Sequence, residues 1–142
     1  MDLRTLADRL QIDDLLTSYT RAIDTGDWDR LDAVFTPDAT IDYTSTGGIA
    51  GSYPEVKAWL AENLPMFPRR QHVLGQKEVR LDEQGGTAQV TAYFLNPMVL
   101  PQADGSELLW EFGGLYHHEL VRVGDGWLSA RLVEELCWQR GS

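Results

Sequence analysis

Three histidines in this chain could take part in proton transfer or metal binding: His72, His117 and His118. The last two are adjacent in a stretch with the pattern of a strand, so their side chains point to opposite faces of a sheet and cannot hold one ion together. A metal site is therefore not expected. For His118, which precedes Glu119, a structural or surface role is the simpler interpretation.

His72 and Asp24 are the residues best placed for acid–base chemistry. His72 follows the proline-rich end of a predicted helix and opens a predicted strand, where its side chain can face the mouth of a cavity; a hydrogen-bonded structural histidine is the alternative. Asp24 ends a predicted helix, although the negative end of the helix dipole disfavours a carboxylate there. Either this carboxylate orients and charges a histidine, or it caps backbone groups of Gly26 or Asp27.

The helices that would position these residues follow from the spacing of apolar side chains. From Leu3 to Asp24 apolar residues recur every three or four positions, which predicts one amphipathic helix that Gly26 terminates. Asp27 can cap a short second helix, which Pro37 and Asp38 end. The predicted helices are Leu3–Asp24, Asp27–Phe35, and a third that starts at Ser52 or Tyr53 and ends at Pro65 and Pro68.

After Arg70 the chain changes to long β-type runs separated by turn residues. Helices followed by an antiparallel meander are typical of an α+β fold. Glycines within the runs, at Gly75, Gly113 and Gly114, are expected to bend the sheet into a cone whose apolar interior can hold a ligand. The predicted strands are Ala39–Tyr43, Gln71–Asp82, Thr87–Leu95, Glu107–Val123 and Trp127–Trp138, with tight turns over 83–86 and 124–126 and a longer loop over 96–105.

Size and charge limit the classes of function. The 142 residues fit a single domain, 1–142, with one core. The net charge of -10, from 22 acidic and 12 basic residues, disfavours nucleic acids and anionic membranes as partners. The acidic residues of the first helical third, Asp8 among them, are expected on a solvated helix face.

The expected location is the cytoplasm. Cys137 is the only cysteine, which excludes an internal disulfide and fits a reducing compartment. The first ten residues, Met1 to Leu10, do not have the pattern of a signal peptide, and no apolar run reaches the ~18 residues of a membrane span. Apolar residues expected on the outer face of the sheet favour a homo-oligomer. These residues are Leu109, Leu115, Val121 and Leu132.

Five short segments carry a family resemblance: Ile23–Leu31 (IDTGDWDRL), Phe35–Ala39 (FTPDA), Ile41–Tyr43 (IDY), Gln71–Gly75 (QHVLG) and Asp125–Trp127 (DGW). With these segments the chain resembles the SnoaL-like branch of the nuclear transport factor 2-like superfamily. The resemblance implies a cone-shaped α+β fold with N-terminal helices packed in a strongly curved antiparallel sheet, a small apolar organic ligand, and assembly as a dimer or trimer. No metal-ligand cluster or phosphate-binding glycine loop indicates a cofactor.

Within that branch the pattern is similar to three kinds of lyase: scytalone dehydratase, bile acid 7α-dehydratase and hexachlorocyclohexane dehydrochlorinase. Each pairs an aspartate at the end of the first helix with a distant histidine, which implies that Asp24 and His72 are this chain's pair. Tyr19 matches a catalytic tyrosine of the bile acid pattern, and Tyr43 matches one of the scytalone pattern. Arg131 resembles a pocket arginine of the dehydrochlorinase; an outward-facing strand arginine is the alternative.

The chain departs from the scytalone pattern at Met98, where that pattern has a second histidine, and at Gly114 and Tyr116, where it has a polar pair. The resemblance therefore implies a different and more apolar ligand than scytalone. Apolar side chains are candidates for the wall of its pocket, although an aromatic stripe can also be plain core. These candidates are Trp59, Met66, Phe94, Met98, Trp110, Phe112 and Tyr116.

The predicted function is that of a small cofactor-independent lyase, in first place a dehydratase. Its Asp24–His72 pair would abstract a proton from an apolar cyclic, polyketide-like or steroid-like substrate. Tyr19 or Tyr43 would stabilise developing oxygen charge or donate a proton to a departing hydroxyl. Isomerisation, cyclisation, epoxide opening, or a non-catalytic ligand-binding or structural subunit are the alternatives on the same fold.

Overall fold

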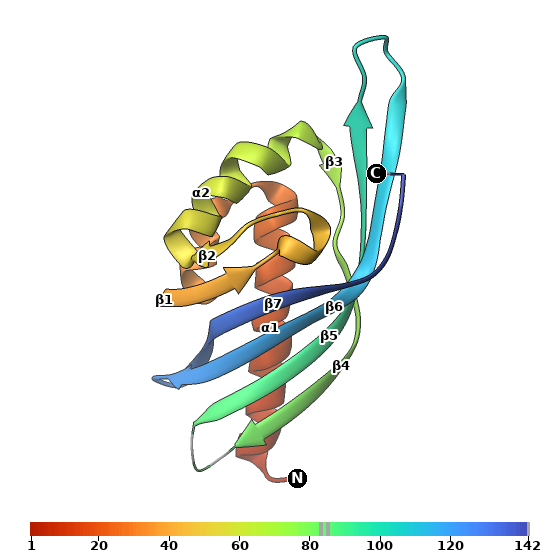
Figure 1. Cartoon of the computed structure of the whole chain (residues 1–142). Coiled ribbons are helices and arrows are strands. Elements are labelled where there is room, and N and C mark those ends of the chain that lie inside the picture. The colour runs from red at the N-terminus through yellow and green to blue at the C-terminus, as the bar shows by residue number, and fades with distance from the viewer. Residues whose placement is uncertain (83, 85, 142) are drawn as a thin grey trace.

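The computed structural model describes residues 1–82, 84 and 86–141 (Figure 1). The described strands form one sheet in the order β2-β1-β7-β6-β5-β3, and β4 pairs with β5 as well. The elements in chain order are α1 (Leu3–Thr25), the 3-10 helix η1 (Trp28–Ala33), β1 (Phe35–Asp42), η2 (Thr44–Thr46), β2 (Ala50–Ser52), α2 (Tyr53–Asn63), η3 (Leu64–Met66), β3 (Arg69–Arg70), β4 (Val73–Asp82), β5 (Thr87–Pro101), β6 (Glu107–Val123) and β7 (Gly126–Arg140).

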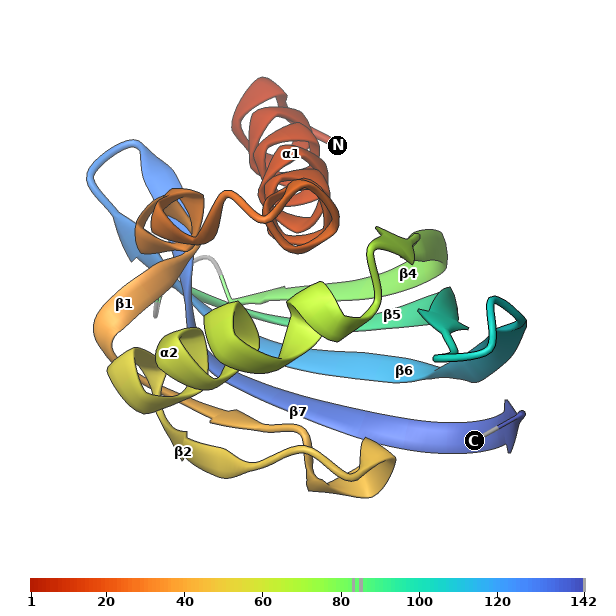
Figure 2. The same ribbon diagram turned by 90° about the horizontal axis from the view of Figure 1, so that it is seen from above.

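The sheet curls around the helices and forms the predicted α+β cone. Figure 2 shows α1 and α2 on the inner side of the curved sheet, with β1 and β2 continuing the curve beyond β7. The core lies between the helices and the inner face of the sheet. Its largest fully buried side chains are Tyr19, Tyr116, Phe35, Ile12, Leu16, Ile23, Leu31, Ile41, Leu120, Leu132, Val34 and Val56.

Helix α1 begins and ends close to the predicted positions. Asp2 is its N-cap and accepts a hydrogen bond from the Thr5 N–H. Gly26 ends it in the left-handed region (φ 73°), where a residue without Cβ is favoured. Leu6 and Leu10, which fit the predicted apolar face, are exposed, because the face of these turns that packs on the sheet carries Asp8 and Ile12 instead. No helix in the described part of the chain is long and apolar enough to cross a membrane.

Asp8 is not on a solvated face, contrary to prediction, and is only 4% exposed. The two guanidinium nitrogens of Arg122 donate hydrogen bonds to its two carboxylate oxygens at 3.0 and 2.8 Å, and Trp127 Nε1 donates a third at 3.2 Å. The hydrogen bonds from Arg122 lower the pKa of Asp8. This bidentate pair joins α1 to the β6–β7 hairpin.

The predicted second helix is the 3-10 helix η1, which ends at Ala33, and β1 begins at Phe35 rather than at the predicted Ala39. β1 runs from Phe35 through Pro37 and Asp38 to Asp42, and its pairing with β7 shifts register between Phe35 and Thr40. This irregular stretch accommodates a proline, which has no N–H to donate to a neighbouring strand. β1 lies parallel to β7, so the sheet is mixed rather than wholly antiparallel. The two strands are not joined by a hairpin, which would force opposite directions.

β5 is longer than predicted. Most of the loop expected over 96–105 is strand, because β5 continues to Pro101 and pairs with β6 up to Glu107. On its other side this part of β5 meets only the two-residue strand β3, and prolines are tolerated along an edge that is so sparsely paired. The tight turn predicted over 83–86 includes residues 83 and 85, which lie outside the described residues.

One residue predicted on the outer face is buried. Leu132 is fully buried, because a register shift between β6 and β7 leaves Ala130 as an extra residue in β7. One extra residue reverses which side chains face inward. Leu109 is exposed, whereas Leu115 and Val121 are partly buried.

The predicted glycine bends are present. The β4–β5 pairing is irregular around Gly75, and the β6–β7 pairing shifts between Gly113 and Gly114. A Cβ atom on Gly114 would lie 2.1 Å from the carbonyl oxygen of Glu135, which is backbone and cannot rotate away. Gly114 therefore permits the close approach of β7 at the bend of β6.

We predict that Gly114→Ala lowers the free energy of unfolding by about 1–3 kcal/mol, because the added methyl group forces β7 away from β6. Gly126→Ala is the control, since a Cβ there meets only one atom, at 4.0 Å, and its backbone is not left-handed. Urea titration of both variants measures the difference. Equal stability of the two variants would contradict the steric explanation of the bend.

Candidate active site

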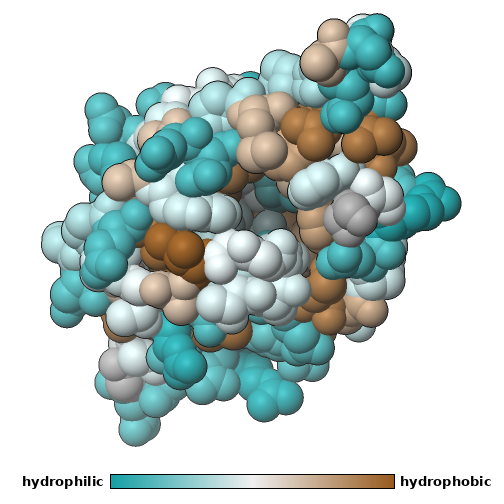
Figure 3. All heavy atoms as spheres, turned by 45° about the horizontal axis from the view of Figure 1, so that its top comes forward, coloured by the Kyte–Doolittle hydropathy of each residue, from teal (hydrophilic) through white to brown (hydrophobic). Residues whose placement is uncertain are grey.

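A cavity of about 280 Å³ opens between the helices and the inner face of the sheet. Figure 3 shows the surface hollowed near the centre of this face, with hydrophobic side chains among those around the opening. Six of the predicted wall residues line the cavity: Trp59, Met66, Met98, Trp110, Phe112 and Tyr116.

Two predicted binding residues lie elsewhere. Phe94 is buried behind the wall, where its ring stacks on Tyr116 with centroids 4.2 Å apart. Arg131 is exposed on the outer face of the sheet, 3.6 Å from Glu119, because the extra residue Ala130 sets its side chain outward. The assignment of Arg131 to the pocket is therefore corrected to its outward-facing alternative.

Asp24 and His72 are in direct contact. His72 Nδ1 lies 2.6 Å from Asp24 Oδ1, and the backbone N–H of His72 donates to Asp24 Oδ2 at 2.9 Å. The side chains are 6% exposed for His72 and 13% exposed for Asp24. Because Nδ1 faces the carboxylate, Nε2 is the ring nitrogen left for a ligand in the cavity, which His72 lines.

Arg70 and Asn96 hold this pair in place. Arg70 Nε donates to the carbonyl of Ile23 at 2.9 Å, and its Nη1 donates to the carbonyl of Phe67 at 3.0 Å. The guanidinium thus joins the end of α1 to the segment that leads into His72. Asn96 on β5 donates to the carbonyl of Gln71 at 2.9 Å and fixes the same segment from the opposite side.

The two predicted tyrosines meet at the cavity wall. The hydroxyls of Tyr19 on α1 and Tyr43 after β1 form a buried hydrogen bond, and Tyr116 on β6 hydrogen-bonds to Tyr19. Burial raises the pKa of each of these tyrosines above the ordinary value. They are therefore neutral hydrogen-bond donors at physiological pH.

Glu134 is a site residue that the sequence analysis missed. It lies on β7, lines the cavity and is 8% exposed. Its Oε1 is 2.5 Å from Thr46 Oγ1, and its carboxyl also hydrogen-bonds to Tyr116. Burial raises the pKa of Glu134 to about 7. The sequence feature that could have identified Glu134 is the adjacent pair Glu134-Glu135 on a predicted strand, since one of two neighbours on a strand must face inward.

The other histidines are separate from this site. His117 is on the outer face, where its Nε2 lies 2.8 Å from Glu135 Oε1. His118 is buried, its Nδ1 lies 2.9 Å from Ser129 Oγ, and burial lowers its pKa to about 3. The two rings point to opposite faces, as predicted. No group of histidine, cysteine or acidic side chains in the described residues is arranged to hold a metal ion.

The curved sheet around helices, with a buried Asp–His pair beside an apolar cavity, is a cone of the nuclear transport factor 2-like type. The chain belongs to the family of the SnoaL-like domain, whose model matches residues 4–133. An uncharacterised Mycobacterium tuberculosis protein, Rv2910c, is 46% identical over 136 residues, which cover 95% of this chain and 89% of the relative. The candidate cyclase FGR4 of Gibberella zeae is 29% identical over 134 residues, with coverage of 85% and 86%.

Solved structures share the fold. A candidate scytalone dehydratase from Novosphingobium aromaticivorans superposes with a TM-score of 0.87 at 17% identity, covering 100% of this chain and 92% of the other. A type 2 hexachlorocyclohexane dehydrochlorinase (LinA) superposes with a TM-score of 0.82 at 22% identity, covering 99% and 92%. At these identities the likeness supports the fold and does not assign a substrate.

We predict that Arg70→Met lowers the free energy of unfolding by about 2 kcal/mol, because the carbonyls of Ile23 and Phe67 lose a charged donor. Arg69→Met is the control, since Arg69 pairs with Glu107 in an exposed position and such pairs contribute at most about 1 kcal/mol. Urea titration of both variants tests this difference. A smaller effect at Arg70 than at Arg69 would show that Arg70 does not anchor the segment.

Proposed function

We propose that this protein is a cofactor-independent lyase, in first place a dehydratase, that acts on a small neutral substrate through the Asp24–His72 pair. The observation that carries the proposal is the contact of 2.6 Å between His72 Nδ1 and Asp24 Oδ1 beside the apolar cavity. A subunit with only a structural role needs neither this contact nor an open cavity next to it.

His72 is the general base in this proposal. Asp24 accepts a hydrogen bond from Nδ1–H, fixes that tautomer, and stabilises the imidazolium that forms when Nε2 takes a proton from carbon. A neighbouring carbonyl group makes this carbon acidic. Tyr19 or Tyr43, whichever hydroxyl does not donate to the other, donates to the carbonyl oxygen as negative charge develops on it.

The lining of the cavity points to the class of substrate. No lysine or arginine lies among the described residues that line it, so an anionic group on the ligand would find no counterion. A volume of about 280 Å³ is near the lower end of small-molecule sites. The substrate is therefore a neutral, largely apolar compound of one or two rings, and a steroid-sized ligand would have to extend through the mouth.

The names of the relatives support reactions that can start from the carbanion formed when His72 removes a proton from carbon. The structural neighbours include a candidate scytalone dehydratase and a dehydrochlorinase, both named for eliminations. Cyclisation is a second candidate, because FGR4, a candidate cyclase, aligns with most of the chain. An enolate formed by His72 can expel a leaving group or attack a second carbonyl of the same molecule.

We predict that His72→Ala lowers the rate of proton abstraction by about 100- to 10,000-fold. The probe is α-tetralone, a neutral bicyclic ketone, and the measurement is exchange of its acidic methylene protons in D₂O by NMR. His117→Ala on the outer face is the matched control and should exchange protons normally. Equal exchange rates in the His72 and His117 variants would refute the proposed function.

Asp24→Asn should reduce the same exchange by up to about 10,000-fold, because an amide favours the wrong histidine tautomer. Its fold should be retained, since asparagine has nearly the same shape and can still accept a hydrogen bond. Circular dichroism together with the exchange rate separates these effects. A folded Asp24→Asn variant with unreduced exchange would remove the aspartate from the mechanism.

We also expect a homo-oligomer. Exposed apolar side chains on the sheet, such as Tyr93, Leu95, Leu109 and Trp138, leave surface that a second copy could cover. Light scattering at micromolar concentration should give a multiple of the chain mass of 16.0 kDa. A monomer under these conditions would refute the expectation.

A further inference from the structure

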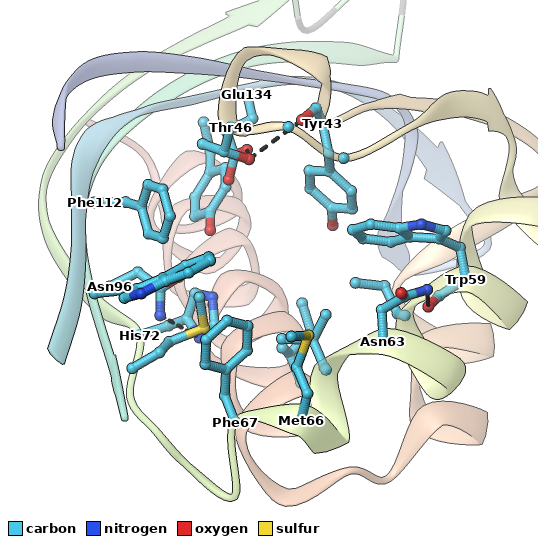
Figure 4. Close-up of a pocket in the computed structure, with 18 of the residues that line it drawn as sticks. Tyr43, Thr46, Trp59, Asn63, Met66, Phe67, His72, Asn96, Phe112 and Glu134 are labelled. Carbon is cyan, nitrogen blue, oxygen red and sulfur yellow. Dashed lines mark hydrogen bonds between the residues drawn. The ribbon is translucent and has the colours of Figure 1, made fainter. Parts of the chain in front are cut away.

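We propose that Glu134 is the general acid of this site, and that it protonates the leaving oxygen at the side of the cavity opposite His72. This inference deepens the proposed function and rests on it. Figure 4 shows the two side chains on opposite sides of the cavity, with Phe112 on one flank and Tyr43 on the other. An elimination needs both a base for the carbon proton and an acid for the departing hydroxyl.

The position of Glu134 on β7 distinguishes it from its neighbour. Glu134 is 8% exposed and lines the cavity, whereas Glu135 is exposed on the outer face beside His117. The loop that carries Thr46 is fixed to the same point of β7, because Ser45 Oγ donates to the backbone carbonyl of Glu134 at 2.8 Å. The carboxyl is thus held by local structure at the cavity wall.

Thr46 holds the Glu134 carboxyl at the cavity wall. Thr46 Oγ1 donates to Glu134 Oε1 at 2.5 Å and also lies 3.2 Å from the backbone carbonyl of Tyr43. That carbonyl already accepts from the backbone N–H groups of Thr46 and Gly48, at 3.2 and 3.0 Å. The single hydroxyl proton of Thr46 is therefore available for Glu134.

The absence of a positive charge among the described residues around Glu134 favours its protonated form. Thr46, Tyr43, Tyr116 and Tyr19 face it from η2, the end of β1, β6 and α1, and all are neutral at physiological pH. The nearby charge of Asp42 adds to burial in raising the pKa of Glu134, to about 7. A carboxylic acid that titrates near neutral pH is suited to proton donation.

The same neighbours stabilise the carboxylate that proton donation leaves behind. Tyr116 hydrogen-bonds to the Glu134 carboxyl, and the Thr46 hydroxyl donates to Glu134 Oε1. Both groups are donors already in place, so little rearrangement is needed when negative charge appears.

The reaction can be balanced for β-hydroxytetralone, which is α-tetralone with a hydroxyl on the carbon next to the acidic methylene group. His72 Nε2 takes a methylene proton, and the electron pair of that C–H bond forms the enolate. The C–O bond then breaks as a new C=C bond forms, and the hydroxyl leaves as water with the proton of Glu134. The product tautomerises to α-naphthol, and transfer of one proton from His72 to Glu134 through water restores the site.

The test compares Glu134→Gln with the unaltered protein in two reactions. Water elimination from β-hydroxytetralone, followed by naphthol absorbance at pH 6, should fall by about 100-fold or more. Methylene exchange in α-tetralone, which needs no acid for a leaving group, should fall much less than water elimination, so the ratio of the two rates is the readout. Elimination of acetate from the acetate ester of β-hydroxytetralone should be nearly as fast in this variant as in the unaltered protein, because acetate leaves without a proton. Glu135→Gln is the control and should retain both reactions.

The outcomes separate this inference from the proposed function. If the unaltered protein shows no exchange that depends on His72, the proposed function is wrong and the role of Glu134 is wrong with it. If exchange occurs but water is not eliminated, or if Glu134→Gln eliminates water at an undiminished rate, only the role of Glu134 is refuted.

A measurement without substrate tests whether Glu134 is protonated. Its pKa in the folded protein, about 7, lies above the ordinary 4.5, so the folded state holds a proton that the unfolded state releases, and stability falls as pH rises through this range. From pH 5 to pH 8 the folding equilibrium constant should fall on the order of 50-fold more for the unaltered protein than for Glu134→Gln. Parallel pH dependence in urea titrations would show that Glu134 is ionised at neutral pH and would refute its role as an acid.

Discussion

The contact between the end of α1 and residues 70–72 is the interaction on which the site depends. A carboxylate at the negative end of a helix dipole is unfavourable by itself, but Arg70 donates to the carbonyl of Ile23 in the last turn and carries a positive charge close to Asp24. Asp24 in turn accepts from both the backbone and the ring of His72. His72 is therefore fixed at two points, which limits the reorganisation that the proposed proton transfer would require.

The second constraint is the absence of a cationic side chain from the described lining of the cavity. Most polar groups of the lining lie at two places on an apolar wall, with His72 and Asn96 at one and Glu134 with its hydroxyl neighbours at the other. Because no cation compensates Glu134, burial keeps its proton near neutral pH. One low-dielectric environment therefore supports both the proposed neutral ligand and the proposed opposite roles of His72 and Glu134 in proton transfer.

The curvature of the sheet determines which side chains reach this environment. Gly114 lets β7 approach the bend of β6, and Tyr116, two residues further along β6, faces the cavity. The extra residue Ala130 turns Leu132 and Glu134 inward and leaves Arg131 outside. An irregularity of one residue thus determines whether an arginine or a glutamate belongs to the site, with opposite consequences for the charge of the ligand.

The sequence by itself determined the two long helices, the strand-rich second half, the glycine bends and the family. These features depend on local spacing, capping and turn residues, which can be identified in the sequence directly. The pairing of Asp24 with His72 followed from the family pattern. Only the tertiary structure decided that β1 runs parallel to β7, that Asp8 is buried against Arg122, that Phe94 lies behind the wall, and that Glu134 faces the cavity. Each of these depends on a partner far away in the chain or on a one-residue register shift. The alternation of polar and apolar residues along the sequence predicts neither.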